Sequence, residues 1–103
     1  MKRIEQIKEW LQSQPKDTFL NYALAIEYIA EQNDGAAESI LERLIEENPE
    51  YYATYYHLGL LKERKGQDDL AIEIYKNGMK ICAKIGNKHA FSELKSVLEN
   101  LEI

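Results

Sequence analysis

The sequence predicts an all-α domain of about six helices, built around a helical hairpin that occurs twice. Two observations lead to this prediction. The stretch Tyr52–Ile85 contains two amphipathic segments separated by Lys65-Gly66-Gln67-Asp68. A shift of 34 residues places this stretch on a second copy, Thr18–Tyr51, in which Leu24 takes the place of Leu58. A fixed period of this length is typical of arrays of stacked helical hairpins.

The composition bounds the class of protein. The chain has 103 residues, of which 45% are hydrophobic and 30% charged, with a formal net charge of −5. This length suits one domain, and a single cysteine, Cys82, excludes an internal disulfide framework. The negative charge argues against non-specific binding to nucleic acid or acidic membranes. No apolar run approaches the roughly 20 residues of a membrane-spanning helix, and Glu5 and Glu9 interrupt any signal-peptide core. The predicted location is the cytoplasm.

The first predicted element is a capping helix within residues 1–14. Its apolar residues recur at helical spacing among charged ones, namely Ile4, Ile7, Trp10 and Leu11. The 34-residue shift maps Ile7 onto Leu41 and Tyr75, so this helix stands where the second helix of a preceding hairpin would stand. It ends before Pro15, because the residue before a proline disfavours helix.

The first repeat covers residues 18–51. Asp17 is a good N-cap for its first helix, which is predicted to run to about Glu31. The run Gln32-Asn33-Asp34-Gly35 turns the chain, and the second helix is predicted to run from about Gly35 to Glu47. Asn48-Pro49-Glu50 is the next predicted break.

The second repeat covers residues 52–85 and is divided at Gly66. Small residues, Gly59 and Ala71, are predicted to let the two helices of the hairpin approach closely, while larger ones fill the remaining space, namely Tyr55, Leu58 and Tyr75. Gly86-Asn87 ends the second helix as a left-handed cap would.

The last predicted element is a second capping helix within residues 88–103. Its expected apolar stripe is Ala90, Leu94, Val97 and Leu101. The repeat does not extend into it, because the shift places Ser92 on Leu58 and Glu93 on Gly59. We therefore expect the array to end at this helix.

The second copy resembles a tetratricopeptide repeat (TPR), through Tyr55, Tyr56, Leu58, Gly59, Gly66, Ala71, Ile72 and Tyr75. The first copy matches through Leu24, Ala25, Tyr28, Ala37 and Pro49, and departs from the family pattern at Asn21 and Leu44, as the second copy does at Gly78 and Ala83. The resemblance, to a small two-repeat member, implies a right-handed superhelix of paired helices, A and B. It also implies that the A helices line a concave side that receives peptides or partner helices.

The predicted binding surface, called here the A-helix face, lies on the first helix of each repeat. In the first repeat Tyr22, Ile26 and Ile29 follow one another at i, i+4 and i+7. In the second repeat the equivalent residues are Tyr56, Leu60 and Glu63, with Tyr52 beside them. Family members that clamp terminal carboxylates present Lys and Asn at such places, so the ligand expected here is apolar or aromatic.

Three uses of the A-helix face remain open. It can receive a peptide or helix of a protein partner, it can close a homodimer, or the capping helices can cover it. The leading prediction is a protein-interaction module of unknown partner.

Other features predict no further activity. Lys76, Lys80, Lys84 and Lys88 recur every four residues, and the shift places Glu42, Glu46 and Glu50 at positions equivalent to the first three. We expect these rows to form exposed ion pairs rather than to bind nucleic acid. His57 and His89 have no second ligand at metal-binding spacing. No catalytic, cofactor-binding or metal-binding residues are predicted, and the protein is not expected to be an enzyme.

Overall fold

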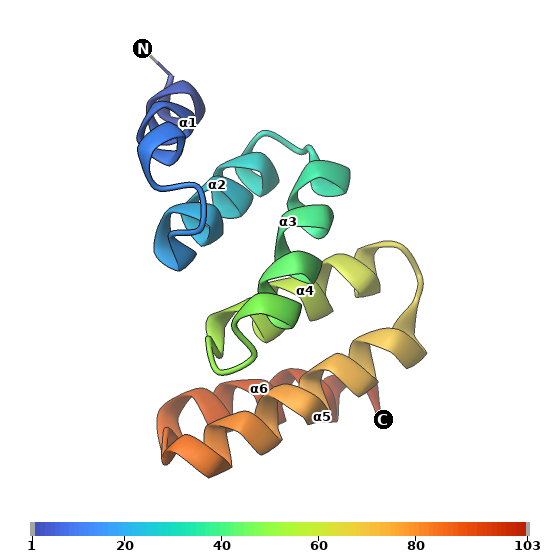
Figure 1. Ribbon diagram of the computed structural model, residues 1–103. Coiled ribbons are helices and arrows are strands. Elements are labelled where there is room, and N and C mark those ends of the chain that lie inside the picture. Colours follow the sequence, from blue (N-terminus) through green and yellow to red (C-terminus); the bar gives the residue numbers. More distant parts are fainter. Residues whose placement is uncertain (1, 103) are drawn as a thin grey trace. The chain divides into compact units, whose positions relative to one another are not determined.

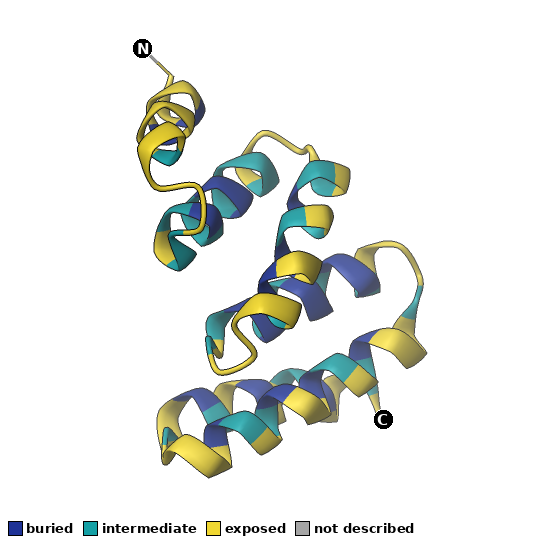
Figure 2. Ribbon diagram, viewed as in Figure 1, coloured by how far each residue is buried: buried dark blue, intermediate teal, exposed yellow. Residues whose placement is uncertain are grey.

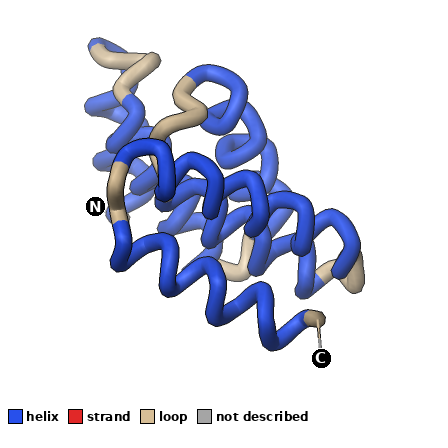
Figure 3. Tube along the Cα trace, turned by 90° about the horizontal axis from the view of Figure 1, so that it is seen from below, coloured by secondary structure: helices blue, strands red, loops and turns tan. Residues whose placement is uncertain are grey.

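The computed structural model describes residues 2–102, so Met1 and Ile103, which the two predicted caps include, lie outside the described residues. This part of the chain contains six helices and no strand (Figure 1, Figure 3). In chain order they are α1 (Arg3–Ser13), α2 (Thr18–Ala30), α3 (Asp34–Glu47), α4 (Ala53–Arg64), α5 (Asp68–Ile85) and α6 (Lys88–Leu101). The all-α prediction and the six predicted helices are confirmed.

The chain divides into two compact units, Met1–Asn48 and Pro49–Ile103. The division falls at the predicted break between the repeats, where Pro49 cannot continue a helix. The first unit holds α1, α2 and α3, and the second holds α4, α5 and α6. Each unit is described by itself.

In the first unit α1 packs on α2 through a cluster of buried residues, Ile4, Ile7 and Leu24. The Asp17 side chain accepts a hydrogen bond of 2.8 Å from the Leu20 amide, so it caps α2 as predicted.

Asn21 stands where the family pattern has an aromatic residue. It is buried, and both polar atoms of its side chain form hydrogen bonds within the first unit. Its amide nitrogen donates to the carbonyl oxygens of Pro15 and Asp17, at 3.1 and 2.9 Å. Its amide oxygen accepts from Arg43 of α3 at 3.0 Å. Because a buried polar group is costly without partners, these bonds fix the turn before α2 and join α2 to α3.

In the second unit α5 contacts both α4 and α6, and α6 is drawn behind α5 in Figure 1. Gly59 of α4 faces the ring of Tyr75, and a methyl group at Gly59 would overlap that ring and lie 2.6 Å from its Cζ. The close approach expected at Gly59 is therefore present, and its partner is the Tyr75 ring. Gly78 has a similar role, since a methyl group there would lie 2.7 Å from Cβ of Tyr55 and 2.9 Å from Cδ1 of Leu94.

The buried side of α6 differs in part from the predicted stripe. Ala90 and Leu94 are buried as expected, but the third buried residue is Leu98, whereas Val97 and Leu101 are only partly buried. Leu98 lies at i+4 from Leu94, so it continues the line of residues that faces α5. Ser92 and Glu93, the residues that break the repeat, are exposed.

The turns within the two repeats have the same backbone form but different residues. Gln32 after α2 and Gly66 after α4 both adopt a left-handed conformation, with φ of 62° and 75°. Gly35, at which the second helix of the first repeat is predicted to begin, lies in the first turn of α3. Gly86 ends α5 with a φ of 79°, which confirms the predicted left-handed cap.

Candidate functional site

The part of the A-helix face that lies on α2 consists of partly buried apolar side chains. Tyr22, Ile26 and Ile29 are each partly exposed, whereas Leu24 and Ala25 on the neighbouring side of the helix are buried. Figure 2 shows this mixture of buried and intermediate positions along α2. The structure thus brings these three predicted residues together as one apolar stripe.

Sequence analysis missed Phe19, which extends this stripe toward the start of α2. Phe19 is 62% exposed, the largest exposed fraction among the large apolar side chains that the structure leaves open to solvent. It precedes Tyr22 by three residues and Ile26 by seven, so it shares their side of the helix. The same spacing rule, applied one turn earlier in the sequence, would have included it.

The part of the A-helix face that lies on α4 is less uniform. Tyr56 and Leu60 are partly exposed, and Tyr52, which precedes the helix, is 39% exposed. The ring of Tyr56 meets that of His57 edge to face, with centroids 5.4 Å apart. Partial burial lowers the pKa of His57 below its ordinary value, so this imidazole is neutral at pH 7.

Glu63, the predicted polar residue of this face, is engaged inside the second unit. The hydroxyl of Tyr75 donates a hydrogen bond to Oε2 of Glu63. Burial of Tyr75 together with this bond raises the pKa of the tyrosine far above its ordinary value, so the hydroxyl keeps its proton. Glu63 therefore joins α4 to α5, and only its remaining lone pairs can serve a ligand.

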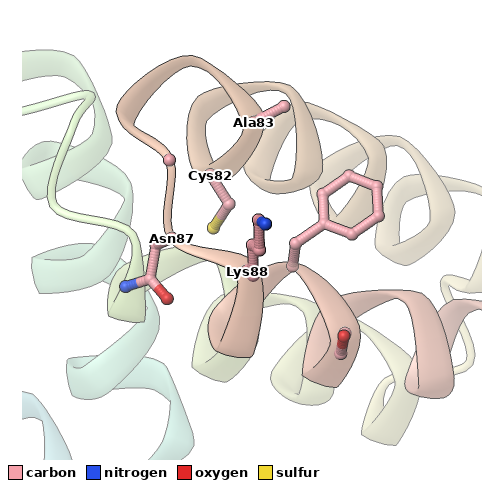
Figure 4. A pocket seen from close by; sticks show the side chains of 7 residues that line it. Cys82, Ala83, Asn87 and Lys88 are labelled. Atoms are coloured by element: carbon pink, nitrogen blue, oxygen red, sulfur yellow. The ribbon is translucent and has the colours of Figure 1, made fainter.

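A second surface feature lies between α5 and α6, and sequence analysis did not single it out. Two adjoining depressions, of about 450 and 320 Å³, share Ala83 of α5 and Phe91 of α6. Figure 4 shows Cys82 and Ala83 on α5, with Asn87 and Lys88 where the chain enters α6. We call this feature the α5–α6 groove and define it by its apolar floor, Met79, Ala83 and Phe91, and its lysine margin, Lys76, Lys80 and Lys88.

The lysines of α5 take different partners. Lys84 pairs with Glu50 at 2.8 Å, which confirms one of the three predicted lysine–glutamate pairs. The hydrogen bond from Lys84 to Glu50 raises the pKa of this lysine. Lys76 pairs with Glu102 after α6, at 3.5 Å, instead of with a residue of the first repeat.

Cys82 lies at one end of the α5–α6 groove, and its side chain is buried. Burial raises the pKa of its thiol, so the unreactive thiol form dominates at pH 7. Within residues 2–102, no group of three or more His, Cys, Asp or Glu side chains is arranged to hold a metal ion. None of the helices described is both long and apolar enough to cross a membrane.

Known structures resemble this chain, although no protein-family model and no curated protein matches it. The crystal structure of a tetratricopeptide repeat domain protein from Salinibacter ruber is 38% identical, covers 84% of this chain and 97% of its own, and superposes with a TM-score of 0.82. A solution structure of such a domain protein from the same organism is 39% identical, covers 85% of this chain and 89% of its own, and has a TM-score of 0.82.

A third structure, of a protein from Bordetella parapertussis, shows the same fold at lower identity. It is 20% identical, covers 99% of this chain and 89% of its own, and has a TM-score of 0.86. The Salinibacter domain carries the assignment, because its 38% identity extends over nearly its whole length. Together with the two helical hairpins at a 34-residue period, this similarity shows that the chain belongs to the tetratricopeptide repeat family.

Proposed function

We propose that the protein is a non-enzymatic protein-interaction module that binds an apolar peptide or helix on its A-helix face. Membership of the TPR family supports an interaction module in general. The observation that carries the choice of surface is the partly exposed apolar stripe of α2, formed by Phe19, Tyr22, Ile26 and Ile29. The cytoplasmic location expected from the sequence stays part of this proposal.

The chemistry of α2 favours an apolar ligand over a charged one. The helix contains no lysine or arginine, and Glu27 is its one charged residue. A peptide carboxylate would therefore find no cation on α2, whereas an apolar side chain would be transferred from water onto Ile26 and its neighbours. On α4, Tyr56 and Leu60 add apolar surface, whereas the cations of this helix, Lys62 and Arg64, lie in its last turn.

The test is selection of peptides from a displayed random library, followed by titration of a selected peptide against variants. We expect selected peptides to carry aromatic or aliphatic side chains. Ile26→Glu should weaken binding by about tenfold or more, because a carboxylate at the centre of the stripe loses its hydration when the peptide covers it. Leu60→Glu tests the residues on α4 in the same way.

Ile85→Glu is the matched control, since Ile85 is 42% exposed at the end of α5 and lies outside the A-helix face. It makes the same chemical change and should leave the affinity unchanged. Circular dichroism must show native helix content for each variant. Equal weakening by Ile85→Glu, or loss of helix content in Ile26→Glu, would contradict the proposed face.

A second candidate function uses the same stripe for self-association. A two-fold dimer requires a self-complementary patch, and an apolar stripe along one helix can pack against its own copy. The mass of the protein in solution distinguishes this candidate from binding of a different partner.

A further inference from the structure

We propose that the α5–α6 groove is a second binding site, separate from the A-helix face, and that it receives an amphipathic helix of another protein. The flanks of that helix carry Asp or Glu. Three features of the second unit lead to this proposal: an apolar floor without a covering helix, a position on α6 that is equivalent to a helix contact in the first unit, and unpaired lysines at the margin.

The position of Phe91 on α6 matches a helix contact in the first unit. Two shifts of 34 residues map Phe91 onto Ala23 of α2. Ala23 packs against the buried cluster shared by α1 and α2, and Ile40 of the following helix, α3, packs against the same cluster. In the second unit Phe91 instead lines the two open depressions.

Met79, the floor residue on α5, also corresponds to a residue at a helix contact in the first unit. Two shifts of 34 residues map Met79 onto Leu11 of α1. In the first unit Leu11 packs against the cluster of Ile4, Ile7 and Leu24, and Ile40 of α3 packs against the same cluster. A third helix therefore adjoins the first two there. In the second unit Met79 instead lines an open depression. This depression therefore offers a surface against which a further helix can pack.

The charges at the margin specify the occupant. Among the ion pairs found within residues 2–102, none involves Lys80 or Lys88, and Lys76 already attracts Glu102. Lys88 also lies in the first turn of α6, where the N-terminal end of the helix dipole favours an anion. A helix with acidic flanks would pair with these cations while its apolar edge covers Met79, Ala83 and Phe91.

The same charges disfavour a second copy of the groove as the occupant. A two-fold contact would place Lys80 and Lys88 of one copy against the lysines of the other. Like charges that meet across an interface are destabilising. The proposed occupant is therefore a helix with acidic flanks and not a second copy of the groove.

The experiment uses the full chain and a displayed library of amphipathic helices about four turns long. The apolar edge is constant, and the flanking positions vary among Glu, Gln and Lys. Selection should enrich Glu at the flanks. A selected peptide is then titrated by fluorescence anisotropy against Lys80→Glu/Lys88→Glu, against Phe91→Ser and against the control Lys95→Glu, which alters an exposed lysine of α6 outside the groove.

We expect the double charge reversal and Phe91→Ser each to weaken binding by about tenfold, and Lys95→Glu and Ile26→Glu to leave it unchanged. A version of the peptide with Lys at its flanks should bind the Lys80→Glu/Lys88→Glu variant about as tightly as the Glu-flanked peptide binds the unchanged protein. A misfolded variant could not give this result. Enrichment of Lys or no enrichment, equal weakening by Lys95→Glu, or failure of the charge-swapped pair would overturn the proposal. Loss of binding in Ile26→Glu alone would instead place the peptide on the A-helix face.

Discussion

At the scale of single residues, Gly59 sets the distance between α4 and α5. Its missing side chain leaves room for the Tyr75 ring, and the hydroxyl of that ring reaches Glu63 four residues further along α4. One small residue thus allows both a close contact and a partly buried hydrogen bond. The sequence pattern predicts the small residue and the tyrosines that fill the space, but it does not say which tyrosine faces Gly59.

Gly59→Ala should lower the free energy of unfolding by about 1–3 kcal/mol, because the added methyl group overlaps a buried ring that cannot move far. Urea denaturation measures this change. Gly35→Ala is the matched control, since Gly35 lies in the first turn of α3 with no atom within 4 Å of the added methyl group. It should leave stability unchanged or raise it by up to about 1 kcal/mol. Equal effects of the two substitutions would contradict the close contact at Gly59.

At the scale of elements, the two repeats make the same left-handed turn with unequal residues. Gly66 adopts its φ of 75° without strain, whereas Gln32 adopts a φ of 62° with a side chain that crowds the backbone. Gln32 is exposed, so no burial depends on its side chain. The turn of the first hairpin therefore has a small free-energy cost from backbone strain, which the glycine in the second turn avoids.

Gln32→Gly should raise the free energy of unfolding by about 0.5–1 kcal/mol, since relief of the left-handed strain exceeds the added freedom of the unfolded chain. The reverse exchange, Gly66→Gln, should lower it by a similar amount. Thermal and urea denaturation measure the free energy of unfolding of both variants. The argument fails if the two exchanges shift stability in the same direction.

At the scale of the whole molecule, the formal net charge of −5 is unevenly distributed. Lysines gather at the margin of the α5–α6 groove. The large exposed apolar side chains lie apart on several elements, namely Trp10, Phe19, Tyr52, Leu70 and Ile85. Single exposed apolar residues are normal on monomers. The part of the chain that the structure describes thus gives more support to partner binding than to self-association.

Light scattering after size exclusion should accordingly give the mass of one chain over a wide range of concentration. We expect the mass to stay unchanged also at high salt, where the repulsion between molecules of net charge −5 is screened. A dimer that Ile26→Glu splits into single chains would favour the second candidate function, in which the A-helix face binds its own copy. A dimer that Phe91→Ser splits would contradict the occupant proposed for the α5–α6 groove.

The sequence by itself determined where the helices begin and end, since caps such as Asp17 and stops such as Pro49 and Gly86 act on their nearest neighbours in the chain. It also determined the period of the repeat and the main apolar side of each helix, because both follow from spacing along a single segment.

Only the tertiary structure decided which side chains meet between helices. Tyr75 engages Glu63 from the next helix. Leu98 rather than Val97 is buried, since it lies one turn after Leu94, whose side chain lies beside Gly78 of α5. The α5–α6 groove also appears only when two helices lie side by side, since neither Met79 nor Phe91 forms a floor alone. Contacts of this kind depend on how helices pack, and the period of a single helix does not contain that information.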